Sequence, residues 1–475
     1  MIIDNDKKQR RVVLQALAAG GLAYAIGKSS GVSFAQMSGG STNFTDYKAL
    51  VCVFLYGGND SWNMIVPLGS PEYDAYYKSR GGGTASSLAI EKSSLLPITR
   101  GDFVATNLNY GFHPNLQGLY ELFNEGRLAA VPNVGPLLKP TSKRQYLETS
   151  SDSRDLPPLL FSHFDQQEQW ANLRGRLLLK TGWGGRMGDI VAPRTGVQQL
   201  PTNVSLYGQS LFQTPGDSDQ YVMGEGGAEF PGGLGVIDDE PDRRVAVLDH
   251  LETTIQSTDN TVFERGYART QKRAINYAQI VNRALSGAPA LKAFPSSVEP
   301  TPLWVQLRTV ARLISQRTSL GMTRQVFFVG LGGFDTHDRQ LADHGRLLDM
   351  LSRSIRAFSD AMVELGVSER VTLFTQSDFG RTLTSNGDGS DHGWGGTQFV
   401  VGGAVRGGRF FGEYPSLSMD GPEVLPFGGS VIPTVSADQY AATLAKWFGV
   451  PQQSLPSVAP NLENFSQWDL GFMTA

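Results

Sequence analysis

The chain has 475 residues, a formal net charge of −4 at pH 7 and a single cysteine. This acidic balance excludes the basic surface that nucleic-acid-binding proteins need, so no nucleic-acid partner is expected. A single cysteine excludes an intrachain disulfide, so a large core must stabilise the fold.

Residues 1–35 have the three-part layout of an export signal. Basic residues end in the pair Arg10-Arg11, an apolar run of fifteen residues extends from Val12 to Ile26, and Ser33-Phe34-Ala35 resembles a cleavage site. The arginine pair followed by VVL resembles the twin-arginine consensus. We therefore expect the twin-arginine translocase as an export partner and a periplasmic or extracellular location. The apolar run is shorter than the roughly 20 residues of a spanning helix, so no stable membrane span is expected, although an uncleaved anchor is an alternative.

Short apolar runs predict buried parallel strands at residues 49–56, 128–131, 326–330, 371–375 and 399–401. Cys52 lies in the first run and is expected to be a small buried apolar residue. Between the third and fourth runs, apolar residues at steps of three and four predict a helix over 341–365, ended by Gly366. Strand, helix and strand in this order predict an α/β fold with a mostly parallel central sheet flanked by helices.

Residues 190–300 have a different pattern. Glycine and proline interrupt residues 201–242, and a polar helix is expected around 265–285. We interpret this stretch as an inserted, cap-like region beside the main sheet, within a single domain that spans residues 36–475.

Acidic residues and histidines gather in the turns next to the predicted strands. Asp60 follows the first, Asp335 and His337 follow the third, Asp378 follows the fourth, and His392 precedes the fifth. A lone aspartate in such a turn most often caps its own backbone. Because ligands of open parallel sheets bind beyond the carboxyl ends of the strands, however, these four turns are expected to meet.

Carboxylates and imidazoles that converge in one crevice repel one another and lose hydration unless a cation neutralises them. These five residues are therefore the candidate ligands of a divalent metal ion. Mixed aspartate and histidine ligands suit Zn²⁺, Mn²⁺ or Fe, whereas a subset with oxygen ligands alone would accept Ca²⁺ or Mg²⁺.

The segment FSHFDQQEQWAN, residues 161–172, predicts a helix that begins near Ser162. Ser162 is a good N-cap by type, which is the structural interpretation. The functional interpretation makes it a nucleophile activated at the helix N-terminus and by a metal. His163 is a candidate acid, base or ligand, or simply a polar residue of the first turn. Both alternatives stay open for each residue.

Three further residues are candidates for substrate binding. Arg381 would clamp an oxyanion, or else form a salt bridge. Asn59 lies in the turn after the first predicted strand, and Trp394 would line a sugar pocket or else belong to the core. Motifs of the GxSxG, phosphate-loop and GxGxxG types are absent from the sequence, which disfavours serine esterases of the α/β-hydrolase type, nucleotide hydrolases and dinucleotide enzymes.

The ordered motifs FLYGGNDSWNMIVP, FSHFDQQ, GGFDTHDRQ, SDFGRT, DHGWGG and GGAVRGGRFFGEYP resemble the domain-of-unknown-function 1501 family, from about Tyr47 to Phe472. That family is similar to the alkaline phosphatase and sulfatase superfamily, whose α/β sheet holds one or two divalent metals and a nucleophile at a helix N-terminus. The resemblance implies an alkaline-phosphatase-like fold, with Ser162 at the nucleophile position. It implies metal ligands at Asp60, Asp335, His337, Asp378 and His392.

Two departures from the superfamily pattern limit what the resemblance implies. Phosphatases have a ligand histidine after the aspartate that matches Asp378, whereas Phe379 stands here. The sequence around Ser162 also lacks the C-x-P-x-R type motif that standard sulfatases need. A complete two-zinc site and a standard sulfatase mechanism are therefore not expected.

The sequence thus predicts an exported metal-dependent hydrolase of phosphate or sulfate esters, with a small-molecule or glycan ester as substrate and Zn²⁺, Mn²⁺, Ca²⁺ or Mg²⁺ as cofactor. The alternative is an envelope protein that binds metal or glycan without catalysis. A third, weaker hypothesis is a metal-free serine hydrolase that uses Ser162 and a histidine.

Overall fold

The computed structural model describes residues 43–100, 109–149, 155–175, 177, 179–230 and 241–474. The expected export signal, residues 1–35, lies outside the described residues. Across the described ranges, every helix is too short or too polar to span a lipid bilayer.

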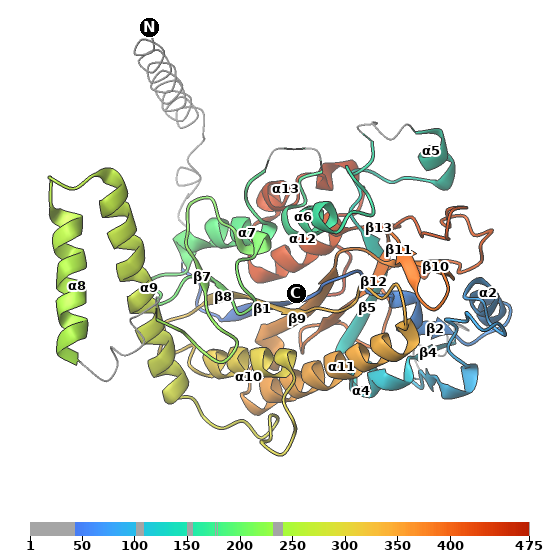
Figure 1. Cartoon of the computed structure of the whole chain (residues 1–475), viewed down its shortest axis with the longest axis horizontal. Helices are drawn as coiled ribbons and strands as arrows, with labels where there is room; N and C mark the ends of the chain where they lie inside the picture. The colour runs from blue at the N-terminus through green and yellow to red at the C-terminus, as the bar shows by residue number, and fades with distance from the viewer. Residues whose placement is uncertain are drawn as a thin grey trace, which may run out of the picture. The chain divides into compact units, whose positions relative to one another are not determined.

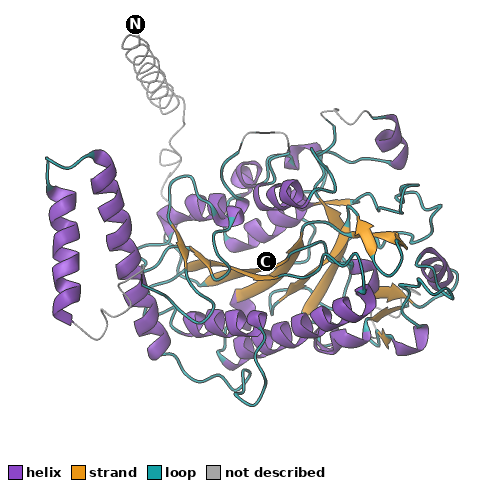
Figure 2. Ribbon diagram, in the orientation of Figure 1, coloured by secondary structure: helices purple, strands orange, loops and turns teal. Residues whose placement is uncertain are grey.

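An eight-stranded sheet forms the centre of the fold (Figures 1 and 2). In spatial order its strands are β13 (Val435–Ser436), β5 (Leu128–Gly135), β12 (Gly396–Val401), β9 (Val371–Ser377), β1 (Lys48–Leu55), β8 (Arg324–Leu331), β6 (Asn203–Ser205) and β7 (Gln220–Val222). Neighbours run parallel except around β12, which is antiparallel to both β5 and β9. The five predicted strands are present as β1, β5, β8, β9 and β12, but the prediction that all five run parallel is wrong for β12.

Strand β1 shows why these segments form continuous apolar runs in the sequence. Val51 and Val53 pack into the core on one face of the sheet, and Cys52 and Phe54 pack into the core on the other. Both faces of a central parallel strand are covered, so polar residues have no place on either. The expected burial of Cys52 is confirmed.

Helices cover both faces of the sheet (Figure 2). The core on one face contains residues of α4 (Gln117–Asn124), α10 (Pro302–Ser315) and α11 (Gln340–Glu364). The core on the other contains residues of α6 (His163–Asn172), α7 (Trp183–Val191), α12 (Ala437–Phe448) and α13 (Leu455–Val458). Helix α11 is the one predicted over 341–365, and Gly366 follows it with φ 65°. This arrangement confirms the predicted α/β fold class with a mostly parallel sheet flanked by helices.

The stretch expected to be an insertion, about 190–300, contributes both to the sheet and to a separate helical pair. Strands β6 and β7 extend the main sheet beyond β8. Helices α8 (Pro241–Gln256) and α9 (Val262–Ser286) pack against each other, as Figure 1 shows. Helix α9, the polar helix expected around 265–285, begins with a capping box between Thr261 and Glu264.

Smaller elements complete the fold. They are a three-stranded sheet of β2 (Ile65–Pro67), β4 (Tyr110–Phe112) and β3 (Leu96–Pro97), the helices α2 (Glu72–Ser79) and α5 (Lys143–Glu148), and a hairpin of β10 (Arg381–Ser385) and β11 (Ser390–His392). Only residues 378–380 separate β10 from β9, so this hairpin lies at the carboxyl end of the sheet. It brings the end of β11 next to the turns that follow β1, β8 and β9.

Candidate metal centre

Three adjacent parallel strands bring their turns to one edge of the sheet. Strand β1 pairs in parallel with β8 on one side and β9 on the other, so the turns after all three strands are neighbours. The first turn requires glycine at position 57, where φ is 114° and a Cβ atom would lie 2.3 Å from the backbone nitrogen of Asp335. Gly57 therefore allows the turns after β1 and β8 to touch.

His163 is the first residue of α6 and is held by a buried carboxylate. Its Nδ1 lies 2.7 Å from Asp378 Oδ2, and Asp378 also accepts hydrogen bonds from Gly57 N and from the Gln167 side chain. A carboxylate only accepts, so Nδ1 of His163 carries the proton and Nε2 presents a lone pair. That Nε2 lies 3.3 Å from Asp335 Oδ2. The hydrogen bond to Asp378 raises the pKa of His163 and outweighs the effect of partial burial.

His392, at the end of β11, is oriented in the same way. Its Nδ1 lies 2.7 Å from the carbonyl oxygen of Phe161, which can only accept. Nδ1 therefore carries the proton, and the Nε2 lone pair faces inward, 3.4 Å from Asp335 Oδ1. Burial lowers the pKa of His392, which favours the neutral, ligating form.

Asp335 lies between these two imidazoles and is held by Arg381. Arg381 Nη2 donates to Asp335 Oδ1 at 2.7 Å, and the same guanidinium donates to the backbone carbonyls of Gly58 and Ser390. Partial burial raises the pKa of Asp335, but Arg381 outweighs it and the net shift is downward. The Asp335 side chain is 45% exposed, so the centre is open to solvent.

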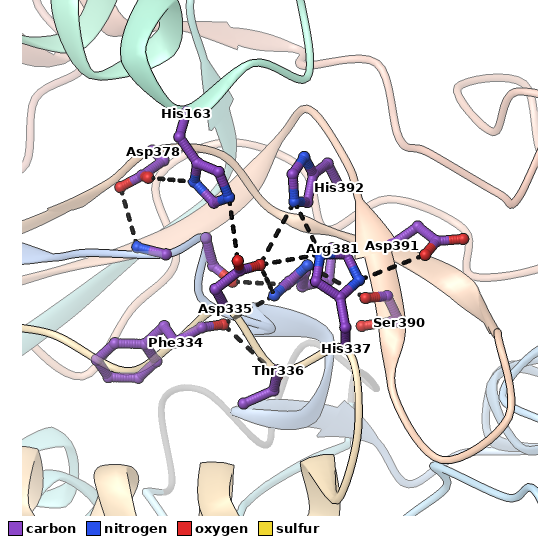
Figure 3. Close-up of polar contacts among 12 residues, drawn as sticks. His163, Phe334, Asp335, Thr336, His337, Asp378, Arg381, Ser390, Asp391 and His392 are labelled. Atoms are coloured by element: carbon purple, nitrogen blue, oxygen red, sulfur yellow. Dashed lines mark hydrogen bonds and ion pairs between the residues drawn. The ribbon is translucent and has the colours of Figure 1, made fainter.

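His337 borders the same group of side chains, as Figure 3 shows. Its Nε2 lies 3.1 Å from Asp335 Oδ1 and 3.0 Å from His392 Nε2. Its Nδ1 lies 3.5 Å from a carboxylate oxygen of Asp391. His337 is thus placed to act as a fourth ligand.

The donor atoms fit a bound cation. One ligand atom each of His163, Asp335 and His392 lies within 4.8 Å of the others, the one such group found across the described residues. Two inward lone pairs and a carboxylate repel one another unless a positive charge lies between them. Moreover, His163 Nε2 is buried without a hydrogen-bond partner. Histidines that donate Nδ1–H to a carboxylate or carbonyl while presenting Nε2 are the usual arrangement around protein-bound metals.

Two of the predicted metal ligands, Asp60 and Asp378, are held by other partners. Asp60 is fully buried, forms an ion pair with Arg80 and accepts from the Gln340 side chain. Because Asp60 lies outside the group of donor atoms around His163, Asp335 and His392, we leave it out of the ligand set. Asp378 remains in the centre, but it contacts His163 and acts through that imidazole.

The predicted substrate-binding residues are all buried. Asn59 Oδ1 accepts from His344 Nε2 at 2.9 Å, and the Trp394 indole donates to the Pro136 carbonyl while packing in a small apolar cluster. Arg381 is enclosed by the turns that it joins. These three side chains are packed among the turns and the core.

Ser162 occupies the N-cap position of α6, but its hydroxyl does not cap the backbone. It donates to Asp165 Oδ2 at 2.7 Å, within the first turn of the same helix. No inference from the sequence had singled out Gln167, Arg80 or the Phe161 carbonyl. Gln167 lies four residues after His163 on the same face of α6, and this spacing could have indicated that the two side chains share a partner. No sequence pattern indicated the role of Arg80.

Comparisons with known proteins identify a family and a distant likeness in fold. The profile of the family described as Protein of unknown function (DUF1501) matches residues 47–424. Among the curated proteins, none matches the chain.

Similar solved structures include two crystal structures. One is the crystal structure of Ps i-CgsB, which has 8% sequence identity to this chain and a TM-score of 0.35. The match covers 88% of this chain and 77% of that chain. The other is the lipoteichoic acid synthase LtaP from Listeria monocytogenes, with 8% identity, a TM-score of 0.31, and coverage of 86% and 73%. Likenesses this distant assign no reaction.

Proposed function

Since this chain belongs to the DUF1501 family of unknown function, we propose its function from the site itself: a metal-dependent hydrolase of phosphate or sulfate esters. The observation that carries the proposal is the inward orientation of the His163 and His392 lone pairs onto Asp335. Such a centre attracts a cation and, through it, an anionic ester.

We propose that His163, His392, His337 and Asp335 hold the divalent ion. Three imidazole nitrogens and one carboxylate favour Zn²⁺, Mn²⁺ or Fe²⁺ over the oxygen-preferring Ca²⁺ and Mg²⁺. Such an ion, when bound, polarises an ester oxygen and lowers the pKa of a water molecule.

The surrounding residues position the ligands and favour a negative charge. Asp378 fixes the ring of His163, and Arg381 fixes the carboxylate of Asp335. The N-terminus of α6 lies beside the centre because His163 is its first residue. The backbone N–H groups of that first turn are partially positive, which favours a phosphate or sulfate group there.

Ser162→Ala tests whether a serine or a water molecule attacks the ester. Because the Ser162 hydroxyl is bonded to Asp165, we expect the variant to lose less than about tenfold in kcat. Removing a true serine nucleophile costs on the order of 10⁶ in kcat. Steady-state kinetics of wild type and variant on the best ester decide between the two, and a loss of several orders of magnitude would restore Ser162 as nucleophile.

A second candidate function is binding of metal or glycan without catalysis. The buried Asp60–Arg80 ion pair favours it, because the resemblance implies a metal ligand at Asp60. The bond between Ser162 and Asp165 favours it too, because it occupies the hydroxyl at the implied nucleophile position.

Metal content and turnover, measured together, separate the two functions. We expect about one divalent ion per purified chain, lost in His163→Ala and kept in His250→Ala, a matched change at an exposed histidine on α8. Turnover is measured on phosphate and sulfate monoesters and diesters and should follow the metal. Bound metal without turnover on any ester would favour the non-catalytic function, and a wild-type chain that binds no divalent ion would overturn both.

We also propose that residues 1–35 direct export through the twin-arginine translocase to the periplasm or the extracellular space. Double substitution R10K/R11K should retain the protein in the cytoplasm, whereas wild type is exported. Fractionation of expressing cells measures this, and unchanged export of the double variant would contradict the proposal.

A further inference from the structure

A cavity of about 300 Å³ lies next to the metal centre. It is lined by Gln167, whose side-chain amide donates to Asp378 at 2.9 Å, and Asp378 holds His163. Phe164, the neighbour of His163, and Tyr56, the neighbour of Gly57, also line it. The cavity therefore adjoins the first turns of α6, the helix that carries His163.

Aromatic rings make up most of the apolar wall of this cavity, which we call the aromatic cavity. Its rings belong to Phe54, Tyr56, Phe164, Phe212 and Phe328. Ring centroids of Phe54 and Tyr56 lie 4.4 Å apart, those of Phe54 and Phe328 6.2 Å apart, and those of Phe212 and Phe328 5.9 Å apart. Phe54, Phe212 and Phe328 are at most 3% exposed and belong to the core beneath the cavity, so the accessible rings are those of the half-buried Tyr56 and of Phe164, which is 71% exposed.

Polar side chains complete the lining. Gln167, Glu168 and Gln209 carry amide and carboxylate groups, and Gln209 is exposed at the edge. Gln167 already donates to Asp378 and Glu168 pairs with Arg174, but an acyl chain that covered Gln209 would offer its amide no hydrogen bond, which costs free energy. A sugar ring matches both parts of the lining, because its C–H faces pack on aromatic rings while its hydroxyls hydrogen-bond at the rim.

The size of the cavity fits the same choice. The aromatic cavity is at the lower end of the roughly 300–1,000 Å³ of small-molecule sites, enough for a single ring.

We propose that the aromatic cavity binds the alcohol part of the ester, and that this alcohol is a sugar. The inference rests on the proposed hydrolase function and names its substrate class. Phe164 is the residue that should contribute most to the preference for sugar esters over other esters. Its exposed ring can cover one face of the sugar while the hydroxyls reach Gln167 and Gln209.

Kinetics on sugar and small esters test the proposal. The probes are galactose 6-sulfate and glucose 6-phosphate, compared with methyl sulfate and methyl phosphate, p-nitrophenyl esters and decyl sulfate. Wild type should prefer the sugar esters in kcat/KM, and Phe164→Ala should reduce that preference about tenfold, mainly through KM. Phe263→Ala, at a ring on α9 that is 84% exposed, is the matched control and should keep the preference. Equal losses on sugar and methyl esters, or a preference for aryl or decyl esters, would overturn the proposal.

A binding measurement keeps the test independent of turnover. Saturation-transfer NMR with methyl galactoside and methyl glucoside should show binding to wild type and His163→Ala but not to Phe164→Ala, with cyclohexanol as an apolar control. Sugar binding by a chain that hydrolyses no ester would contradict the hydrolase function alone. Absence of sugar binding, or equal binding of cyclohexanol, would contradict the sugar subsite.

Discussion

At the scale of single residues, the candidate centre depends on which nitrogen of each histidine carries the proton. The Phe161 carbonyl and the Asp378 carboxylate accept from Nδ1 of His392 and His163, so both Nε2 lone pairs face Asp335. With the protons on Nδ1, the Nε2 atoms of both histidines and the Asp335 carboxylate are available together as ligands for a cation. This proton position also changes the expected role of Asp378, whose carboxylate accepts a hydrogen bond from His163.

Asp378→Asn tests this supporting role. The amide lacks the charge that stabilises the His163 imidazole in its ligating orientation, so we expect metal affinity to fall roughly 10- to 100-fold while the fold persists. Competition titration against a chelator measures the affinity. Asp249→Asn, at an exposed carboxylate on α8, is the matched control. A loss of metal beyond detection would instead indicate that Asp378 binds the ion directly.

At the scale of elements, close contacts between turns set the geometry of the centre. Gly389 is one such contact, since a Cβ atom there would lie 2.2 Å from the backbone carbon of His337. The β10–β11 hairpin and the turn after β8 can therefore meet only with glycine at this position. The glycines of these motifs allow the backbones of neighbouring turns to come into contact.

Gly57→Ala tests the most demanding of these contacts. At φ 114° an alanine is strained, and its Cβ would also overlap the backbone nitrogen of Asp335. We expect a loss of at least about 2 kcal/mol in the free energy of unfolding, together with weaker metal binding. Denaturant titration gives the first quantity. Gly83→Ala, with φ 81° and open space around its Cβ, should cost only about 1 kcal/mol; equal losses in the two variants would show that the contact with Asp335 is relaxed easily.

At the scale of the whole molecule, buried histidines make the fold sensitive to acid. Burial, with repulsion from neighbouring positive groups, lowers the pKa of His113 to about 3 and that of His344 to about 3, from an ordinary 6.5. Between pH 6.5 and about 3 the unfolded chain therefore binds protons that the folded chain does not. Stability is retained above pH 6.5 and falls as the pH drops through this window.

His344→Gln should flatten this pH dependence. A glutamine amide can replace the hydrogen bond of His344 to Asn59 without taking up a proton. We expect wild type to lose on the order of 2 kcal/mol per buried histidine between pH 7.5 and pH 5, and the variant to lose correspondingly less. Urea unfolding at both pH values measures the difference, with His250→Gln as an exposed control. Identical losses in wild type and His344→Gln would show that His344 is not buried in the neutral form.

The sequence alone determined the α/β fold class and the positions of five strands of the central sheet. Buried strands such as β1 and β8 carry apolar residues on both faces and helix α11 repeats its apolar residues every three to four positions, so local pattern is enough to place them. The same reasoning placed the turns with Asp335, His337 and Asp378 at one edge of the sheet, because carboxyl ends of adjacent parallel strands coincide. His392 reaches that edge through the β10–β11 hairpin and the antiparallel β12, which the sequence did not predict.

The tertiary structure decided which polar residues form the centre and which support the fold. Asp60 and Asp335 both follow strands of the sheet and both pair with an arginine, yet Asp60 is fully buried against Arg80, while Asp335 is partly exposed and faces two imidazoles. Hydrogen-bond partners such as the Phe161 carbonyl are backbone atoms, which carry no residue-type signal. Pairing, burial and proton position depend on contacts between segments far apart in the chain, and local sequence pattern does not encode them.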